Sequence, residues 1–230
     1  QKENIHYLTI WLILSPLLHL LKRLIMEEFI MITTIIFDIG NVLAAYDWEG
    51  ALRRLGCQDE TFEAVADAVF RSPDWKEMDR GVLTLEELLQ RFIRRAPEYE
   101  KEIRQVILDY SYMARQYPYT RPWLKELKER GFRLYYLSNY GEFGVQETQK
   151  ALDFRELMDG GLFSYEVQLI KPDRWIYEEL LRRYQISPEE AVFFDDSLPN
   201  IETACSLGIH GIHFTGYEDA RKKLEALLAQ

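Results

Sequence analysis

Polar side chains that could take part in a displacement reaction recur along this chain, and all but a lone lysine before Pro172 stand directly after short apolar runs. A carboxylate can attack an electrophile and form a covalent intermediate, a lysine can neutralise an anionic group, and adjacent carboxylates repel each other unless a cation lies between them. Because ligands bind at the carboxyl ends of the strands in a parallel sheet, we expect these side chains to lie close together. In chain order they are Asp38, Ser138 with Asn139, Lys171, and Asp195 with Asp196.

The elements that must position these side chains alternate, after Met31, between short apolar strands and amphipathic helices, which is typical of a parallel α/β sheet. Pro122 and Gly131 bracket a helix predicted over residues 123–130, since proline favours the first turn and glycine the position after the last. Gly208 likewise ends a helix predicted over residues 199–207. The predicted strands cover residues 32–37, 132–137, 161–165, 191–194 and 210–214.

Between residues 47 and 118 the strand pattern disappears, and the sequence predicts helices only. Thr84 followed by Glu87 is a capping box, which marks the start of one of them. We therefore expect an α/β core of residues 31–47 and 118–230, interrupted by a helical insertion of residues 48–117. The helices predicted in the insertion cover residues 48–55, 61–70, 84–94 and 98–116.

An aspartate, a hydroxyl, a lysine and an acidic pair in this order resemble the four motifs of the haloacid dehalogenase (HAD) superfamily. The resemblance runs from about Met31 to the last residue. Its nearest branch is the DxGNV type, carried here by Asp38-Ile39-Gly40-Asn41-Val42, which includes α-glucose-1-phosphatase-like sugar phosphatases. The resemblance implies a Rossmann-like three-layer α/β/α core with a parallel sheet, and identifies the helical insertion as a small C1-type cap.

The resemblance also assigns chemical roles to the conspicuous residues. Asp38 would be the nucleophile that forms an aspartyl-phosphate, which water then hydrolyses. Lys171 would neutralise the nucleophile and the transferring phosphoryl group. Ser138 would donate its hydroxyl to a phosphate oxygen, and Asn139 and Asn41 would also contact the substrate.

A Mg²⁺ ion is the cofactor that the resemblance implies. Mg²⁺ prefers oxygen ligands in octahedral geometry and keeps several waters. Asp38 and Asp196 would be direct ligands, and the backbone carbonyl of Gly40 would supply a further oxygen. Asp195 would act behind them or through a water molecule.

Gly40 departs from the family pattern, because most phosphatases of the superfamily carry a second aspartate there. That aspartate acts as general acid to the leaving oxygen and then as base for the hydrolytic water, a role worth about 10²–10⁴ in rate. Three outcomes follow from its absence. The leaving oxygen needs little protonation, as in a sugar 1-phosphate; another carboxylate substitutes, with Asp47 as the candidate; or the chain has no phosphatase activity.

The composition of the chain limits which kinds of ligand and which cellular location are expected. The chain has 230 residues and a formal net charge of −10, which argues against nucleic acid as a ligand. Two cysteines, Cys57 and Cys205, do not make a disulfide framework, and a reducing, cytoplasmic location fits them best. Monomer and dimer both remain open.

The first thirty residues form a segment for which we expect no role in the chemistry. Residues 5–21 are mostly apolar but short and interrupted for a membrane span, and no basic region or cleavage site marks a secretory signal. Met31 directly precedes the first predicted strand, so residues 1–30 are interpreted as an N-terminal extension and membrane association is not expected.

The leading hypothesis is a Mg²⁺-dependent phosphatase that acts on a small phosphorylated metabolite, with sugar phosphates as one candidate class. A 2-haloacid dehalogenase is the first alternative, since it uses the same aspartate on carbon and also lacks the second aspartate. The acidic pair favours the phosphatase, because carbon–halogen displacement needs no metal. A non-catalytic phosphate-binding or interaction protein is the third hypothesis, and retention of Asp38, Lys171 and the metal carboxylates speaks against it.

Overall fold

The computed structural model describes residues 31–229, of which 33–229 belong to one compact unit. The expectation for residues 1–30 lies outside the described part of the chain. No helix within residues 31–229 combines the length and the apolar character that a membrane span requires.

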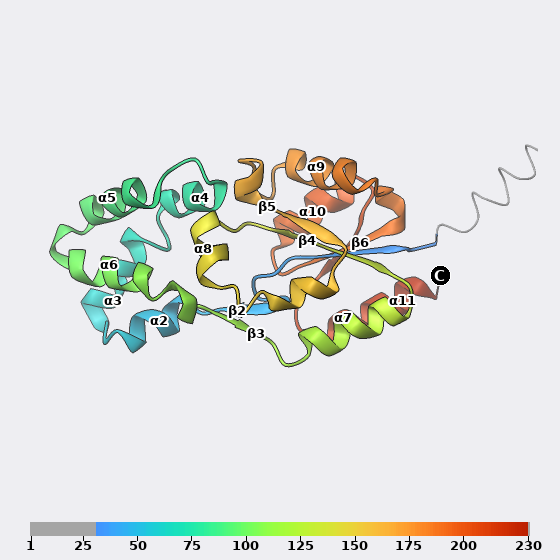
Figure 1. Ribbon diagram of the computed structural model, residues 1–230, viewed down its shortest axis with the longest axis horizontal. Coiled ribbons are helices and arrows are strands. Elements are labelled where there is room, and N and C mark those ends of the chain that lie inside the picture. The colour runs from blue at the N-terminus through green and yellow to red at the C-terminus, as the bar shows by residue number, and fades with distance from the viewer. Residues whose placement is uncertain (1–30, 230) are drawn as a thin grey trace, which may run out of the picture. The chain divides into compact units, whose positions relative to one another are not determined.

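Five parallel strands form the central sheet, in the order β5-β4-β1-β6-β7 (Figure 1). The predicted α/β fold is therefore confirmed, and each predicted strand exists with ends within two residues of those observed. The chain runs from β1 to one neighbour and later returns to the other, so β1 lies at the switch point where α/β sheets bind ligands. The strands are β1 (Thr34–Phe37), β4 (Arg133–Ser138), β5 (Gly160–Phe163), β6 (Ala191–Asp195) and β7 (His210–His213).

Helices cover both faces of this sheet, which makes the three layers that the family resemblance implies. Figure 1 shows α9 (Arg174–Tyr184) and α10 (Leu198–Ser206) on one face, and α7 (Thr120–Glu129) and α11 (Tyr217–Leu228) on the other. The short helix α8 (Glu142–Glu147) follows β4. Since both faces are covered, β1 and β6 are buried along their whole length and read as unbroken apolar runs.

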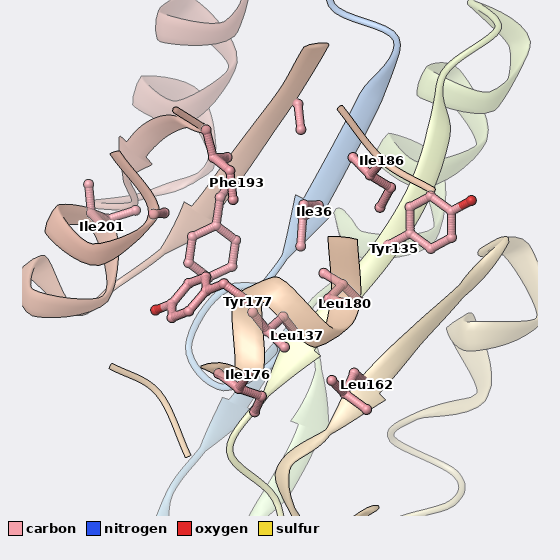
Figure 2. Packing of buried hydrophobic residues seen from close by; sticks show 13 residues of the cluster. Ile36, Tyr135, Leu137, Leu162, Ile176, Tyr177, Leu180, Ile186, Phe193 and Ile201 are labelled. Carbon is pink, nitrogen blue, oxygen red and sulfur yellow. The ribbon is translucent and has the colours of Figure 1, made fainter. Parts of the chain in front are cut away.

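A buried apolar cluster fixes α9 and α10 against the sheet (Figure 2). Strand residues contribute one side of it, and α9 contributes three consecutive turns of apolar side chains. On the opposite face, the ring of Trp123 from α7 packs edge-on against Phe37 and Phe194, at 5.0 and 5.3 Å between centroids. The cluster of Figure 2 includes Ile36, Leu137, Leu162, Ile176, Tyr177, Leu180, Phe193 and Ile201.

Five helices follow β1 and the short strand β2 (Ala44–Tyr46), where the sequence predicts four. The capping box at Thr84 is present, and α5 begins one residue later. The additional helix is α4, which starts with Pro73 and ends at Gly81 in the left-handed conformation, with φ of 70°. The helices are α2 (Trp48–Arg54), α3 (Asp59–Ala68), α4 (Pro73–Arg80), α5 (Leu85–Arg95) and α6 (Glu100–Leu108).

The helix predicted over residues 98–116 is wrong in its second half. Helix α6 ends at Leu108, and Ala114–Gln116 forms strand β3, which pairs antiparallel with β2. Pairing with a distant segment decides the conformation there, and local helical periodicity cannot report it. β2 and β3 are thus the two connections between the helical region and the sheet, while the exact division into core and cap stays a prediction.

Truncating a buried leucine should show which contacts hold the sheet and its helices together. Leu162 is fully buried, so Leu162→Ala should lower the free energy of unfolding by about 2–5 kcal/mol. The same substitution at Leu108, which is 69% exposed, should change it by less than about 0.5 kcal/mol. Urea denaturation of both variants measures the difference, and equal effects would contradict the described packing.

Candidate active site

The strand register brings the predicted polar residues to one edge of the sheet. Phe37 of β1 lies level with Phe194 of β6, and the Asp38 N–H donates to the Phe194 carbonyl at 2.8 Å. Asp38 therefore stands beside Asp195, the last residue of β6. Ser138 ends β4 on the other side of β1.

Lys171 lies between two of these carboxylates. Its ammonium is 2.9 Å from Oδ1 of Asp38 and 2.6 Å from Oδ2 of Asp195, and only 4% of the residue is exposed. Burial alone would lower the pKa of Lys171, but the charges and hydrogen bonds of both aspartates outweigh it and raise the pKa. The cation is therefore permanent at neutral pH.

Asn139 fixes the backbone of this lysine. Its Oδ1 accepts a hydrogen bond from the Lys171 N–H at 2.7 Å, and its Nδ2 donates to the Lys171 carbonyl at 3.0 Å. The two segments that carry Ser138 and Lys171 are thereby joined, although 32 residues separate Asn139 from Lys171. The described contacts of Asn139 are those of a positioning residue.

Asp195 is fully buried, and both of its oxygens are engaged. Oδ1 accepts hydrogen bonds from the Ser197 N–H at 2.8 Å and from Asn200 Nδ2 at 2.9 Å. Oδ2 accepts a hydrogen bond from the Lys171 ammonium. Asn200 was not singled out from the sequence, and its backbone carbonyl in turn accepts from the Tyr177 hydroxyl at 3.0 Å. Asp195 consequently orients Lys171 and lies behind the cavity.

Asp196 follows on the solvent-accessible side. Asn41 donates from Nδ2 to Asp196 Oδ2 at 3.0 Å, and Asn41 itself has a φ of 56°, a left-handed conformation that asparagine tolerates better than most residues. Carboxylate oxygens of Asp38, Asp195 and Asp196 lie within 4.8 Å of one another, which makes them a candidate cation site. Burial raises the pKa of Asp38 to about 6 even though Lys171 opposes the shift.

Asp38, Asn41 and Asp196 line a cavity of about 190 Å³, and Asp195 lies behind it. Gly40 lies in its wall, and a Cβ atom built there would meet no heavy atom within 4 Å. The first atom of a side chain at this position would therefore lie in open space. The residues that line the cavity are Asp38, Gly40, Asn41, Tyr46, Trp75, Asp79, Tyr110, Ser138, Asn139, Tyr140, Lys171, Asp196 and Asn200.

Asp79 enters the same cavity from helix α4 and was missed by the sequence reasoning. Desolvation, followed by the charge of Asp38, raises the pKa of its carboxyl to about 7, although a hydrogen bond from the Gly141 N–H opposes this. The proline and glycine that bracket α4 are the same signals that predict the helix over residues 123–130, so the element could have been found. That Asp79 points into the cavity could not have been predicted from these signals.

Asp47, the carboxylate that the sequence suggested as a substitute acid, has a different place. Its side chain caps helix α2 by accepting a hydrogen bond from the Gly50 N–H at 2.8 Å, and it does not line the cavity. A carboxylate at the first turn of a helix satisfies free backbone donors there. Asp47 is therefore close to Gly40 in the chain but does not reach the cavity that Gly40 lines.

Comparison with known proteins agrees with this architecture. The model of the haloacid dehalogenase-like hydrolases matches residues 32–208, and the chain belongs to this family of hydrolases. It is 30% identical over 202 residues to the mouse protein Acyl-CoA dehydrogenase family member 10, a match that covers 84% of this chain but only 19% of the mouse protein. It is 25% identical over 184 residues to a sesquiterpene phosphatase of Aspergillus oryzae, covering 78% of this chain and 88% of the fungal one.

A solved structure shares the fold. A HAD family enzyme of Bacteroides thetaiotaomicron, in complex with magnesium and inorganic phosphate, superposes with a TM-score of 0.62 at 21% identity. The alignment covers 79% of this chain and 93% of the bacterial one.

Two aspartates of helix α4 should respond to pH in opposite directions. The pKa of Asp79 in the folded protein lies above its ordinary value of 3.8, so its contribution to stability is complete below about pH 4 and is lost as the pH rises to about 7. Burial would also raise the pKa of Asp74, but hydrogen bonds from Arg95 and Arg91 prevail and lower it, so its contribution is lost only in acid.

Urea unfolding at about pH 4 and about pH 8 tests this difference. Relative to the wild type, Asp79→Asn should gain stability as the pH rises, because the wild-type carboxyl must ionise at a partly desolvated position. Asp74→Asn should lose stability over the same interval or remain uniformly less stable. A pH-independent difference for Asp79→Asn would contradict the raised pKa.

Proposed function

We propose that this chain is a Mg²⁺-dependent phosphatase of the DxGNV branch, which hydrolyses a small phosphorylated metabolite through an aspartyl-phosphate on Asp38. The observation that carries the proposal is the buried ammonium of Lys171 between Asp38 and Asp195, next to Asp196 at the edge of the cavity. This arrangement places a nucleophile, a fixed cation and a candidate metal site around one point. The phosphatase named among the relatives supports the same reaction class.

In the proposed reaction, an oxygen of Asp38 attacks phosphorus, and the bond from phosphorus to the substrate oxygen breaks. Lys171 offsets negative charge on the nucleophile and on the equatorial phosphoryl oxygens. Ser138 ends β4 beside Asp38, and its hydroxyl can donate to one of those oxygens. Water then attacks the aspartyl-phosphate and releases phosphate, which restores the Asp38 carboxylate.

The local charge supports a divalent cation at this site. Asp38, Asp195 and Asp196 bring three carboxylates together, and Lys171 is the only cationic side chain among the described residues that line the cavity. Asp195 is saturated by hydrogen bonds, so Asp38, Asp196 and the Gly40 carbonyl would hold the ion. When bound, Mg²⁺ supplies charge neutralisation for a phosphoryl oxygen.

The rest of the cavity favours a substrate whose leaving part is uncharged. Its cap side is aromatic, and within the described lining no second cation is present to hold another phosphate or a carboxylate. Aromatic faces suit sugars as well as hydrocarbon groups. A sugar monophosphate or the phosphate of another neutral alcohol fits this lining, and the name of the fungal relative refers to a sesquiterpene.

Removing divalent metal should abolish activity. Hydrolysis of p-nitrophenyl phosphate should fall to background in excess EDTA and return when Mg²⁺ is added, because the paired carboxylates then repel both each other and the substrate. Undiminished turnover in EDTA would contradict the proposal. Metal-free turnover of a 2-haloacid would instead favour the dehalogenase alternative.

Replacing the nucleophile should stop the reaction without unfolding the chain. Asp38→Asn should lower kcat for p-nitrophenyl phosphate by at least about 10³-fold, since the amide cannot form the covalent intermediate. Asp67→Asn, the same substitution on the exposed side of α3, should leave kcat within about twofold. Near-normal turnover by Asp38→Asn would rule out the covalent mechanism.

A further inference from the structure

We propose that Asp79 of helix α4 protonates the leaving oxygen and then deprotonates the hydrolytic water, which fills the role that Gly40 leaves open. The inference rests on the proposed phosphatase function and assigns a residue outside the four sequence motifs. It places the nucleophile and the acid on separate parts of the molecule, one at the end of β1 and one in the helical insertion.

The geometry of phosphoryl transfer decides on which side the acid must lie. The attacking and leaving oxygens stand roughly in line on opposite sides of phosphorus. Asp38 attacks from the end of β1, so the leaving oxygen must lie toward the opposite wall of the cavity. The lining residues that do not come from the strand ends of the central sheet include Asp79 and Trp75 from α4, together with Tyr46 and Tyr110.

The other carboxylates of the site have other roles and cannot serve as the proton donor. Asp38 is the nucleophile, and Asp195 is closed off by Lys171, Ser197 and Asn200. Asp196 accepts a hydrogen bond from Asn41 beside the candidate metal site. Among the described residues that line the cavity, Asp79 is the remaining carboxyl group, and Gly40 lines the same cavity.

Contacts with the sheet domain hold Asp79 in a defined position. The Ser164 hydroxyl, just after β5, donates to the Asp79 backbone carbonyl, and the Gly141 N–H, three residues after β4, lies close enough to the Asp79 carboxyl to lower its pKa. Gly141 approaches α4 so closely that a Cβ atom would lie 2.6 Å from the Met78 carbonyl oxygen. The helix is therefore seated directly on the strand ends that carry the other site residues.

The surroundings of Asp79 suit a proton donor. The titratable groups that face it are Asp38 and Lys171 from the strand ends, and the phenols of Tyr46, Tyr110 and Tyr140. These phenols have pKa values raised by burial, so they stay neutral and are weaker acids than the carboxyl. The Tyr46 hydroxyl is buried and has no hydrogen-bond partner of regular geometry in the described chain, so it is available to an oxygen atom in the cavity.

The proton balance of the two steps is complete with this residue. In the first step, the bond between Asp38 and phosphorus forms, the bond to the leaving oxygen breaks, and the Asp79 proton moves to that oxygen. In the second step, water attacks phosphorus, the bond to Asp38 breaks, and the water proton moves to the Asp79 carboxylate. The products are an alcohol and phosphate, and both aspartates return to their starting states.

Two substrates distinguish a proton donor from a residue that only supports the fold. An aryl phosphate such as p-nitrophenyl phosphate has a good leaving group, whereas a primary alkyl phosphate needs protonation. In Asp79→Asn, kcat/KM should fall by at least about 10² for the alkyl phosphate and by less than about tenfold for the aryl one. Because kcat/KM reports formation of the aspartyl-phosphate, slow hydrolysis should appear separately, as a burst of one equivalent of p-nitrophenol.

The matched control is Glu77→Gln on the same helix, whose side chain pairs with Arg80 outside the cavity. It should leave the alkyl-to-aryl ratio of kcat/KM unchanged. If Asp79→Asn lost kcat/KM equally on both substrates, so that the alkyl-to-aryl ratio stayed the same, the role of Asp79 as proton donor would be overturned. Since the wild type would still turn over aryl phosphate and Asp38→Asn would not, that result would leave the phosphatase assignment standing.

A second variant tests the same inference by rescue. A Cβ atom at Gly40 would meet no heavy atom within 4 Å, so Gly40→Asp should supply an acid from the strand side. The double variant Gly40→Asp/Asp79→Asn should regain at least about tenfold of the lost kcat/KM for the alkyl phosphate. Failure to regain any of it would count against a missing proton as the cause of the defect.

Discussion

The ion pairs of Lys171 with Asp38 and Asp195 are the contacts on which the arrangement of the site depends. A lysine that is only 4% exposed is tolerable because two carboxylates meet it, and the Ser197 N–H and Asn200 donate further hydrogen bonds to Asp195. Those carboxylates come from neighbouring strands, so their distance is set by the register of β1 and β6. Removing one partner would leave an uncompensated buried charge, which typically costs about 3–5 kcal/mol.

The same network explains why amides surround the site. Asn139 and Asn200 each offer hydrogen bonds to a charged segment without adding a charge of their own. Asn139 holds the backbone of Lys171, and Asn200 holds the carboxylate of Asp195. The charged atoms are thus fixed before a substrate arrives, and little reorganisation is needed during the reaction.

The parts of this molecule that follow from local pattern could be predicted from the sequence, whereas the parts that depend on distant contacts could not. Strands β1 and β6 are uninterrupted apolar runs that end at aspartates, so their place and their polar ends were evident. Strand β3 exists only because β2 lies beside it. Asn200 falls within a predicted helix and Ser164 within a predicted strand, and only the folded chain shows what they bind.

Asp79 illustrates the same limit at the centre of the site. Helix α4 has recognisable start and stop signals, but whether its seventh residue points to solvent or to Asp38 depends on how the helix docks. Gly141 decides this docking, because any larger residue there would push α4 away from the strand ends. A small residue two positions after the Ser138-Asn139 motif therefore controls how α4 docks over the site.

The open space at Gly40 has a consequence for how such a hydrolase can diversify. On the proposed mechanism, the strand motifs provide attack and charge compensation, while the helical insertion provides both the walls around the alcohol and the proton that the alcohol needs. A substitution within α4 would then alter, in a single change, which alcohols fit and how readily each one departs. Selectivity could therefore drift through the insertion alone while the phosphate-handling machinery of the sheet stayed constant.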